Sequence, residues 1–290
     1  MTSPTGHWRR RAVFIDVDGT YAHQGRVPAG HADAVSRVRA AGHLVFLCTG
    51  RPMSLLPPHV TAAGFDGVVA GAGAYVSWGD EVLLDTRFPA ELAARAITVL
   101  DAHGALFFLE APEATHARRA VIEAMRHFGS AQARADVDPD ADAGGEDLGR
   151  DDVTNALRAT EDLGGIAFGK ITSLYARTPL GEIAAEIGPE VSVLTSSMAE
   201  LGPGAGEIFL AQTHKAVGIE AMLARLGMAR EDVVAAGDGP NDLEMLAFAG
   251  TAVVIEGSSP ELLAHADVVA APPEREGLVA AFATLGLLAR

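Results

Sequence analysis

The chain has 290 residues and a formal net charge of −16, with 49% hydrophobic and 21% charged residues, which is the composition of a globular protein of one or two domains. This acidic balance argues against duplex nucleic acid and anionic membrane surfaces as partners. No apolar run approaches the ~18 residues that a membrane-spanning helix needs. Cys48 is the one cysteine, so an intrachain disulfide is excluded and a reducing cytoplasm is the expected location.

The first part of the chain alternates apolar runs with segments of helical spacing. We expect strands at Arg10–Ile15, Leu44–Cys48 and Gly67–Ala70, and helices over His31–Ala41 and from Pro52 to Gly64. This alternation predicts a parallel sheet with helices on its faces.

The middle of the chain mixes hairpins and helices, which is typical of an α+β unit. A turn at Gly79-Asp80 joins two short strands into a hairpin. The strands expected here are Tyr75–Trp78, Val82–Thr86, Ala105–Glu110, Gly169–Tyr175 and Val191–Ser196. The helices expected here are Glu91–His103, Thr115–Phe128 and Leu180–Ile187.

The strand and helix alternation returns near the C-terminal end. Strands are expected at Glu207–Ala211, Val233–Ala236 and Thr251–Ile255, with helices over His214–Leu226 and from Asn241. The sequence therefore predicts an α/β protein. Its Rossmann-like parallel-sheet core comprises residues 1–82 and 199–290, and an inserted α+β domain comprises residues 83–198.

Residues 131–152 form an unusually acidic segment, with eight acidic residues against Arg134 and Arg150. Like charges repel and nothing apolar anchors them, so we expect a solvated loop. Alternating aspartates suggest a calcium loop as the alternative. Pro139 and the lack of a glutamate at the twelfth position argue against an EF-hand.

The strongest chemical signal is Asp16-Val17-Asp18-Gly19-Thr20, directly after a buried strand. Two carboxylates at the mouth of a parallel sheet repel each other and lose solvation, and a divalent cation would offset both costs. An Asp-Gly turn without a metal is the plainer alternative for this motif alone.

A second acidic loop, Gly237-Asp238-Gly239-Pro240-Asn241-Asp242, follows another buried strand. It adds two carboxylates and an amide at the carboxyl end of that strand. Oxygen ligands of this kind suit Mg²⁺, which keeps several waters when bound to protein. Either loop alone could be an ordinary turn, whereas both together favour a hard-cation site.

Two further elements could hold an anion. Thr49-Gly50-Arg51 offers a hydroxyl and backbone N–H groups between a strand and a helix. Lys215 lies in the first turn of a helix, where the macrodipole disfavours a cation unless an anion or carboxylates lie beside it. A helix cap at Thr49 and a solvated surface lysine are the alternatives.

These four motifs, in this order, resemble those of the haloacid dehalogenase superfamily of phosphohydrolases. The form Thr49-Gly50-Arg51 and the run Gly237–Asp242 are most similar to its Cof-type subfamily, and the position of the insertion matches a C2-type cap. The resemblance implies that Asp16 is the nucleophile that forms an aspartyl-phosphate and that Asp18 is the general acid and base.

The resemblance also implies a Mg²⁺ ion held by Asp16, the backbone carbonyl of Asp18, and Asp238. The phosphoryl group would be bound by Thr49, Gly50, Lys215 and Asn241. Asp242 and Arg51 would lie beside these residues and support them without reacting themselves.

The predicted function is a magnesium-dependent phosphatase for phosphomonoesters of small metabolites, with sugar phosphates foremost. The alternatives are a phosphotransferase or phosphomutase on the same scaffold, or a non-catalytic metabolite-binding protein that kept the fold. The expected partner is a small phosphorylated metabolite, with neither nucleic acid nor membrane involved, and the sequence carries no signal for an oligomeric state. The insertion would close over the site as a lid.

Several residues get plainer predictions. Relatives often carry Asn-Gly-Ala where this chain has Ala72-Gly73-Ala74. His23 is expected to be solvated, with a contact to substrate as the alternative, and Cys48 is expected to be a small core residue. Lys170 is expected at the surface, with a contact to the polar end of a substrate as the alternative. Alternation predicts that one face of the strand with Phe107-Phe108 is buried.

Overall fold

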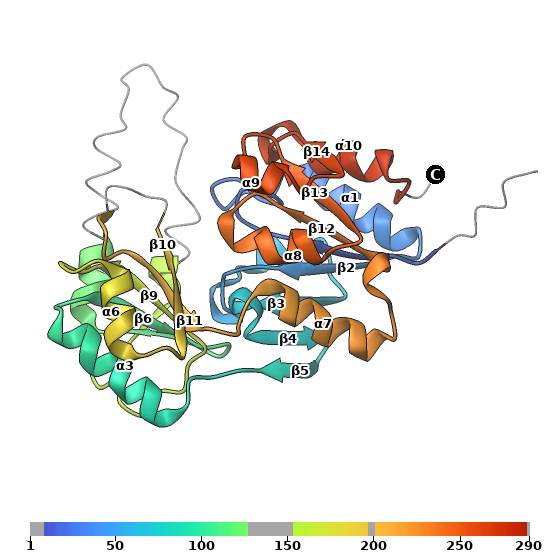
Figure 1. Cartoon of the computed structure of the whole chain (residues 1–290). Coiled ribbons are helices and arrows are strands. Elements are labelled where there is room, and N and C mark those ends of the chain that lie inside the picture. Colours follow the sequence, from blue (N-terminus) through green and yellow to red (C-terminus); the bar gives the residue numbers. More distant parts are fainter. Residues whose placement is uncertain (1–8, 127–152, 197–200, 289–290) are drawn as a thin grey trace, which may run out of the picture.

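The computed structural model describes residues 9–126, 153–196 and 201–288, so the acidic segment 131–152 and the expected limit at residue 198 lie outside the described residues. Two β-sheets organise the rest, each with helices packed against it (Figure 1). This mixed α/β architecture with a parallel-rich sheet confirms the predicted fold class.

The larger sheet has eight strands in the order β14-β13-β12-β1-β2-β3-β4-β5. The first six are parallel to their neighbours, and β4 and β5 are added antiparallel at one edge. Its strands are β1 (Ala12–Ile15), β2 (Leu44–Cys48), β3 (Gly67–Ala70), β4 (Tyr75–Trp78), β5 (Glu81–Asp85), β12 (Val233–Gly237), β13 (Thr251–Ile255) and β14 (Val268–Ala270).

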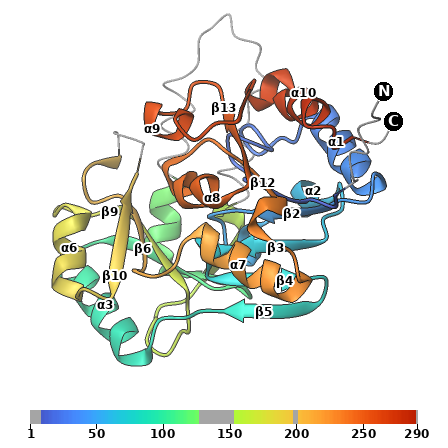
Figure 2. The ribbon, with the colours of Figure 1, turned by 45° about the vertical axis from the view of Figure 1, so that its right-hand side comes forward.

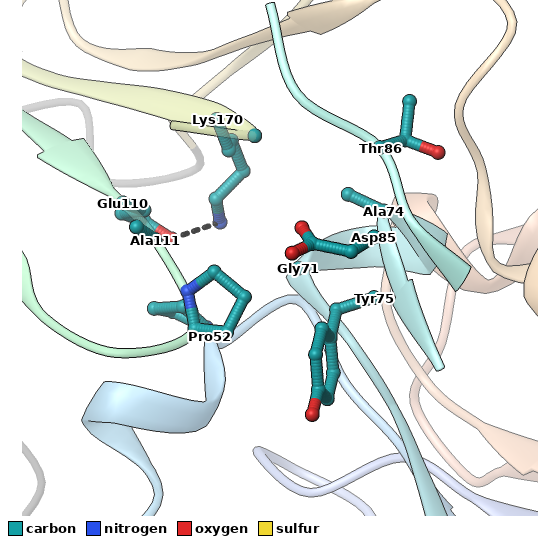
Figure 3. A pocket seen from close by; sticks show the side chains of 11 residues that line it. Pro52, Gly71, Ala74, Tyr75, Asp85, Thr86, Glu110, Ala111 and Lys170 are labelled. Atoms are coloured by element: carbon teal, nitrogen blue, oxygen red, sulfur yellow. Dashed lines mark ion pairs between the residues drawn. The ribbon is translucent and has the colours of Figure 1, made fainter. Parts of the chain in front are cut away.

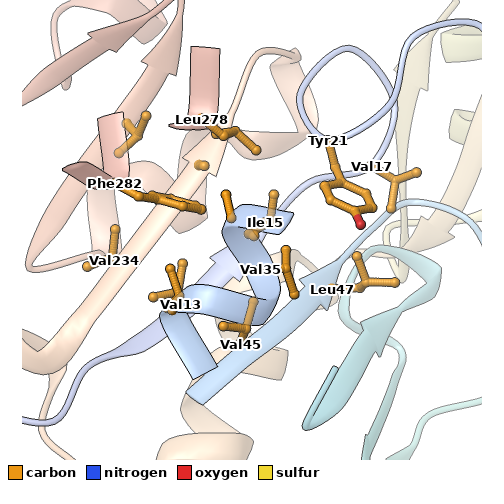
Figure 4. Packing of buried hydrophobic residues seen from close by; sticks show 14 of the residues in the cluster. Val13, Ile15, Val17, Tyr21, Val35, Val45, Leu47, Val234, Leu278 and Phe282 are labelled. Carbon is orange, nitrogen blue, oxygen red and sulfur yellow. The ribbon is translucent and has the colours of Figure 1, made fainter. Parts of the chain in front are cut away.

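The central strands are apolar throughout because helices cover both faces of the sheet. One face packs against α1 (Ala29–Ala40) and α10 (Gly277–Thr284), and Figure 4 shows side chains of this layer around Phe282 and Val35. The opposite face packs against α7 (Lys215–Leu226) and α8 (Leu243–Phe248). Every residue of β1 and β2 is therefore buried.

The smaller sheet has six strands in the order β10-β11-β9-β6-β7-β8. Helices α3 (Ala90–Ala102) and α6 (Leu180–Ile187) pack on one of its faces. Its strands are β6 (Leu106–Glu110), β7 (Thr115–Ala117), β8 (Leu157–Ala159), β9 (Lys170–Tyr175), β10 (Val191–Thr195) and β11 (Gly206–Leu210).

Strand β6 is buried on both faces, although alternation alone predicts only one. Phe107 packs with the α3 and α6 side of the sheet. Phe108 packs on the opposite side, together with Leu55, which belongs to a short 3-10 turn of the larger unit. The smaller sheet thus covers part of the larger unit rather than facing solvent there (Figure 2).

The strand expected at Glu207–Ala211 exists as β11 but belongs to the other sheet. The predicted limits place it in the second core segment, whereas β11 pairs antiparallel with β10 and β9 of the smaller sheet. Strand β5 likewise continues to Asp85 in the larger sheet. We therefore propose that the inserted domain begins after β5 and ends after β11, in place of the limits 83 and 198.

Two expected helices differ from the structure. The segment Pro52–Gly64 forms a 3-10 turn, Met53–Leu55, and a short helix α2 (Pro58–Thr61), because the Pro57-Pro58 pair interrupts helical geometry. The segment from Thr115 begins as β7, and only residues 119–126 of its described part are helical. A helix α9 (Pro260–Leu263) precedes β14.

Within the described ranges, no helix combines the length and the apolar character required to cross a bilayer.

Candidate active site

The sheet order brings the predicted motifs to one edge. Strands β12, β1 and β2 are neighbours and run parallel, so their carboxyl ends lie side by side. Asp16 directly follows β1, Thr49 follows β2, and Asp238 follows β12. This is the edge at which open parallel sheets bind ligands.

Lys215, at the first position of α7, joins two of the acidic motifs. Its Nζ donates hydrogen bonds of 2.5 Å to Oδ1 of Asp16 and 2.5 Å to Oδ1 of Asp242, and the lysine is fully buried. Burial alone lowers a lysine pKa, but the two carboxylates raise the pKa of Lys215 above its ordinary value. The lysine therefore stays charged, and its charge compensates buried acids.

Three carboxylates converge beside this lysine. Asp16, Asp238 and Asp242 each place an oxygen within 4.8 Å of the others. Burial, then the neighbouring acids, raises the pKa of Asp16 well above its usual value, against the opposing effect of Lys215. Burial raises the pKa of Asp238 to about 6. Buried oxygen donors that hold such costly charge fit a hard divalent cation.

Asp242 organises the second acidic loop. Its Oδ2 accepts hydrogen bonds from the backbone N–H groups of Asp238 (3.0 Å) and Gly239 (2.9 Å), while its Oδ1 contacts Lys215. This geometry suits the supporting role expected of Asp242. The three carboxylates that converge in the structure therefore include Asp242, whereas the metal ligands predicted from the sequence are Asp16, the backbone carbonyl of Asp18, and Asp238.

Gly19 is required by the close approach of the two acidic loops. Its φ is +88°, a left-handed conformation that favours glycine. A Cβ at this position would lie 2.3 Å from Oδ2 of Asp238. The hydroxyl of Thr20 donates a 2.7 Å hydrogen bond to Oδ1 of the same carboxylate, which fixes its orientation.

Arg51, in the loop after β2, binds Asp18, the other acid predicted to take part in catalysis. Arg51 donates two hydrogen bonds to Asp18, from Nε to Oδ2 (2.7 Å) and from an Nη atom to Oδ1 (2.6 Å). Its backbone N–H also donates to Oγ1 of Thr49 (3.1 Å). The side chain of Asp18 is 51% exposed, and it is not among the three carboxylates that converge near Lys215.

A cavity of about 270 Å³ lies beside Lys215, and neither Asp16, Asp18 nor Asp238 is among its described lining residues. The core lines it with Ala72, Lys215 and Asn241, and the smaller sheet lines it with residues of β10 and β11 that include Glu207. A Cβ on Gly50 would lie 3.2 Å from Nδ2 of Asn241, so Gly50 allows the asparagine to approach the loop. The structure thus brings the predicted phosphate-binding residues to the wall of one cavity or next to it.

Ala72 occupies the cavity wall at the position where relatives often carry asparagine. It adopts a left-handed backbone with φ of +55°, which an asparagine tolerates better than an alanine. The alanine leaves the cavity larger and without an amide at this point. Gly73 beside it allows close packing, because a Cβ there would lie 2.2 Å from the carbonyl oxygen of His214.

Two other predictions concern residues near the motifs. His23 contacts Oε1 of Glu274 through Nδ1 at 2.9 Å, so it pairs with a residue of the larger unit. Cys48 is fully buried in β2, as predicted, and burial raises the pKa of its thiol above its ordinary value.

The prediction that Lys170 lies at the surface is wrong. It is buried, and its Nζ contacts Oε1 of Glu207 (2.5 Å), Oε2 of Glu110 (3.2 Å) and the carbonyl oxygen of Gly50 (2.7 Å). Figure 3 shows it pointing toward Glu110 in the wall of a small cavity of about 20 Å³, which both residues line. Sequence reasoning missed this group because its partners come from β6, β11 and a loop of the larger unit.

This second cluster sets one buried ammonium against two carboxylates. Burial alone would lower the pKa of Lys170, but Glu110 and Glu207 raise it on balance. Burial raises the pKa of Glu110 in turn, and Lys170 opposes that effect. The lysine therefore links two strands of the smaller sheet to the loop that carries Thr49 and Arg51.

Comparisons with known proteins agree with this geometry. The model of the haloacid dehalogenase-like hydrolase family matches residues 13–282. YkrA of Bacillus subtilis (strain 168), which is named provisionally as a phosphatase, is 27% identical over 285 residues, which is 96% of this chain and 98% of that protein.

Solved structures share the fold at low sequence identity. The sugar phosphatase BT4131, described as a member of subclass IIB of the superfamily, matches with a TM-score of 0.74 and 20% identity, over 96% of this chain and 100% of that chain. The phosphatase BT1666 from Bacteroides thetaiotaomicron matches with a TM-score of 0.75 and 21% identity, over 99% of both chains. The chain therefore belongs to the haloacid dehalogenase-like hydrolases and is a Cof-type phosphatase of that family.

Proposed function

We propose that the protein is a magnesium-dependent phosphatase that hydrolyses phosphomonoesters of small metabolites through an aspartyl-phosphate on Asp16. The observation that carries this proposal is the placement of Asp16. It is buried at the carboxyl end of β1, bonded to Lys215, and within 4.8 Å of Asp238 and Asp242 through their carboxylate oxygens.

In the first step, a carboxylate oxygen of Asp16 attacks phosphorus, and the bond between phosphorus and the leaving oxygen breaks. The carboxyl of Asp18 gives its proton to that leaving oxygen. In the second step, Asp18 takes a proton from water, whose oxygen attacks the same phosphorus. This step releases inorganic phosphate and restores Asp16.

The pair between Asp18 and Arg51 bears on this role. Both carboxyl oxygens of Asp18 accept hydrogen bonds from Arg51, so this contact must open before Asp18 can approach a leaving oxygen. An incoming phosphoryl group gives Arg51 an alternative partner of the kind it binds well.

The phosphoryl group would be held by the groups at the strand ends. We assign this role to the Thr49 hydroxyl, the backbone N–H of Gly50, the Asn241 amide and the Lys215 ammonium. Mg²⁺ would be held by Asp16, the Asp18 carbonyl and Asp238, and when bound it supplies charge that stabilises the phosphoryl oxygens. Lys215 opposes the rise in the pKa of Asp16 and orients its carboxylate between the two acidic loops.

The leaving group would occupy the cavity beside Lys215. Its volume of about 270 Å³ suits a small metabolite rather than a protein side chain presented on a folded surface. The structural neighbour BT4131 is described as a sugar phosphatase, which supports sugar phosphates as the first candidates for this chain. We place the enzyme in the cytoplasm, because a protein with one cysteine has no intrachain disulfide that would require an oxidising compartment.

The test is a phosphate-release assay with an aryl phosphate and a panel of sugar phosphates, with Mg²⁺ and with EDTA. Release should require Mg²⁺, and Asp16→Asn should abolish it while the circular dichroism spectrum is unchanged. Substantial turnover by Asp16→Asn would remove Asp16 as the nucleophile. An isomeric sugar phosphate as product, in place of inorganic phosphate, would show a mutase.

Metal binding can be tested without activity. Mg²⁺ should raise the melting temperature of the wild type, because it binds the folded protein. The rise should be smaller in Asp238→Asn, which loses a charged oxygen ligand. Equal shifts in the two proteins would exclude Asp238 from the metal site.

A further inference from the structure

We propose that Glu207 selects the substrate: it accepts hydrogen bonds from the leaving group, so the site favours phosphomonoesters of hydroxyl-bearing or amino compounds over phosphomonoesters that carry a carboxylate. This inference rests on the proposed function, because it assumes that the leaving group enters the cavity of about 270 Å³.

Glu207 belongs to the wall of this cavity. It lies on β11, beside the edge strand β10, and its side chain is 26% exposed. The same wall includes Lys215 and Asn241 of the larger unit. Glu207 is thus a charged group of the inserted domain that faces the space next to the proposed phosphoryl site.

Lys170 holds this carboxylate in a fixed place. Its Nζ contacts Oε1 of Glu207 at 2.5 Å and the carbonyl oxygen of Gly50 at 2.7 Å. Because one nitrogen contacts both atoms, Glu207 and the loop of Thr49 lie within two hydrogen-bond lengths of each other. A leaving group of a few carbon atoms can therefore reach the carboxylate while its phosphoryl group is bound.

The charge of the cavity determines what can bind there. Glu207 and Glu244 both line it. The one lysine or arginine among its described lining residues is Lys215, whose ammonium is bonded to Asp16 and Asp242. A hydroxyl or an ammonium can donate to Glu207, whereas a carboxylate on the substrate would be repelled and could not donate.

A matched pair of probes separates these classes. sn-Glycerol 3-phosphate and 3-phosphoglycerate differ in a terminal hydroxymethyl group against a carboxylate. Each is measured as a competitive inhibitor of aryl phosphate hydrolysis by the wild type with Mg²⁺ at pH 8. We expect glycerol 3-phosphate to bind at least about tenfold more tightly.

Two variants then test Glu207 itself. Glu207→Gln should reduce the preference for glycerol 3-phosphate at least about threefold, because a glutamine also donates to a carboxylate and carries no charge. Glu110→Gln is the matched control, since Glu110 contacts the same Lys170 but does not line this cavity. It should leave the preference unchanged. Thermal unfolding verifies that both variants are folded.

Three results would overturn the inference: equal affinity of the wild type for the two probes, an unchanged preference in Glu207→Gln, or an equal loss of preference in Glu110→Gln. The last result would show that the effect passes through Lys170 rather than through contact with the ligand. Failure of the wild type to hydrolyse the aryl phosphate at all would instead refute the proposed function, and this inference with it.

Discussion

At the residue scale, Gly19 offers a sharp test of how closely the two acidic loops must approach. In Gly19→Ala, the new Cβ would lie 2.3 Å from Oδ2 of Asp238, so the carboxylate or the loop must move by the better part of an ångström. We expect turnover to fall about a hundredfold or more, because misplacement on this scale is costly in an active site. Steady-state kinetics with an aryl phosphate measures the effect.

Gly79→Ala is the control for this variant. Gly79 also has a positive φ, +56°, but a Cβ there would meet no atom within 4 Å. The backbone strain should cost about 1–2 kcal/mol in the free energy of unfolding and leave turnover unchanged. A similar loss of turnover in both variants would mean that backbone strain, rather than the contact with Asp238, is responsible.

Tyr21 carries a second prediction at this scale. Its ring is fully buried, edge-on to Phe65 with centroids 5.5 Å apart, and its hydroxyl has no hydrogen-bond partner among the described residues. Burial raises the pKa of this phenol to about 12. Tyr21→Phe should therefore leave the free energy of unfolding unchanged or raise it by about 1 kcal/mol, as measured by chemical denaturation.

Tyr21→Ala is the comparison, and it should cost about 3–5 kcal/mol because it removes the ring and leaves a cavity. A loss of more than 1 kcal/mol in Tyr21→Phe would contradict the prediction, since it would show that the hydroxyl has a stabilising partner.

At the element scale, the pairing of β11 sets the limits of a functional truncation. Ile208 of this strand is fully buried among side chains of the smaller unit. Replacing residues 87–195 by a short Gly-Ser linker would leave β11 without β9 and β10, so this protein should aggregate. Replacing residues 87–212 removes β11 as well and should give a soluble core with cooperative unfolding.

Soluble yield and thermal denaturation followed by circular dichroism distinguish the two truncated proteins. If the first folds as well as the second, then β11 does not depend on the smaller sheet, and the revised domain limits are wrong.

The elements also show what the sequence can predict. The bounds of α6 (Leu180–Ile187) follow from apolar residues at helical spacing, which are the ones it buries. The bounds of β13 (Thr251–Ile255) follow from a continuous apolar run, which is typical of a strand covered on both faces. The apolar run of β11 likewise indicates a strand, but the sequence does not indicate that β10 and β9 are the strands with which it pairs. A local pattern indicates a strand without saying which sheet it joins.

The same limit applies to the site. Asp16 and Asp238 are predictable neighbours, since parallel strands with short connections place their carboxyl ends together. Lys170 is not, because its carboxylate partner Glu207 is 37 residues away and the contact depends on the register of an antiparallel sheet. Nothing near Lys170 in the sequence indicates that register.

At the scale of the whole molecule, His31 joins segments that are far apart in the chain. Its Nδ1–H donates to the carbonyl oxygen of Tyr21 (2.9 Å), and its Nε2 accepts from the backbone N–H of Leu278 (3.2 Å). The bond from Leu278 requires a neutral ring, because Nε2 accepts only while it carries no proton, and burial lowers the pKa of this histidine. The folded state therefore loses stability relative to the unfolded state as pH falls below about 6.5.

The prediction is that the stability advantage of the wild type over His31→Asn is complete above pH 6.5 and shrinks as pH falls toward 5. Asparagine cannot titrate, and the remaining groups contribute about equally in both proteins. Urea denaturation in EDTA at pH 5, 6, 7 and 8 measures the difference. An advantage that is constant or grows on acidification would contradict this assignment of His31.

The burial of Cys48 has a practical consequence. This thiol is fully inaccessible at the end of β2, and burial disfavours its reactive thiolate form. Thiol reagents should leave the native wild type unmodified and label one site per chain after unfolding, so the labelling rate in buffer reports how often the core opens. An engineered cysteine at Ser192, in the cavity wall, would then accept a fluorophore selectively without deletion of the native cysteine. The wild-type sequence can therefore serve directly as the background for fluorescence measurements of ligand entry.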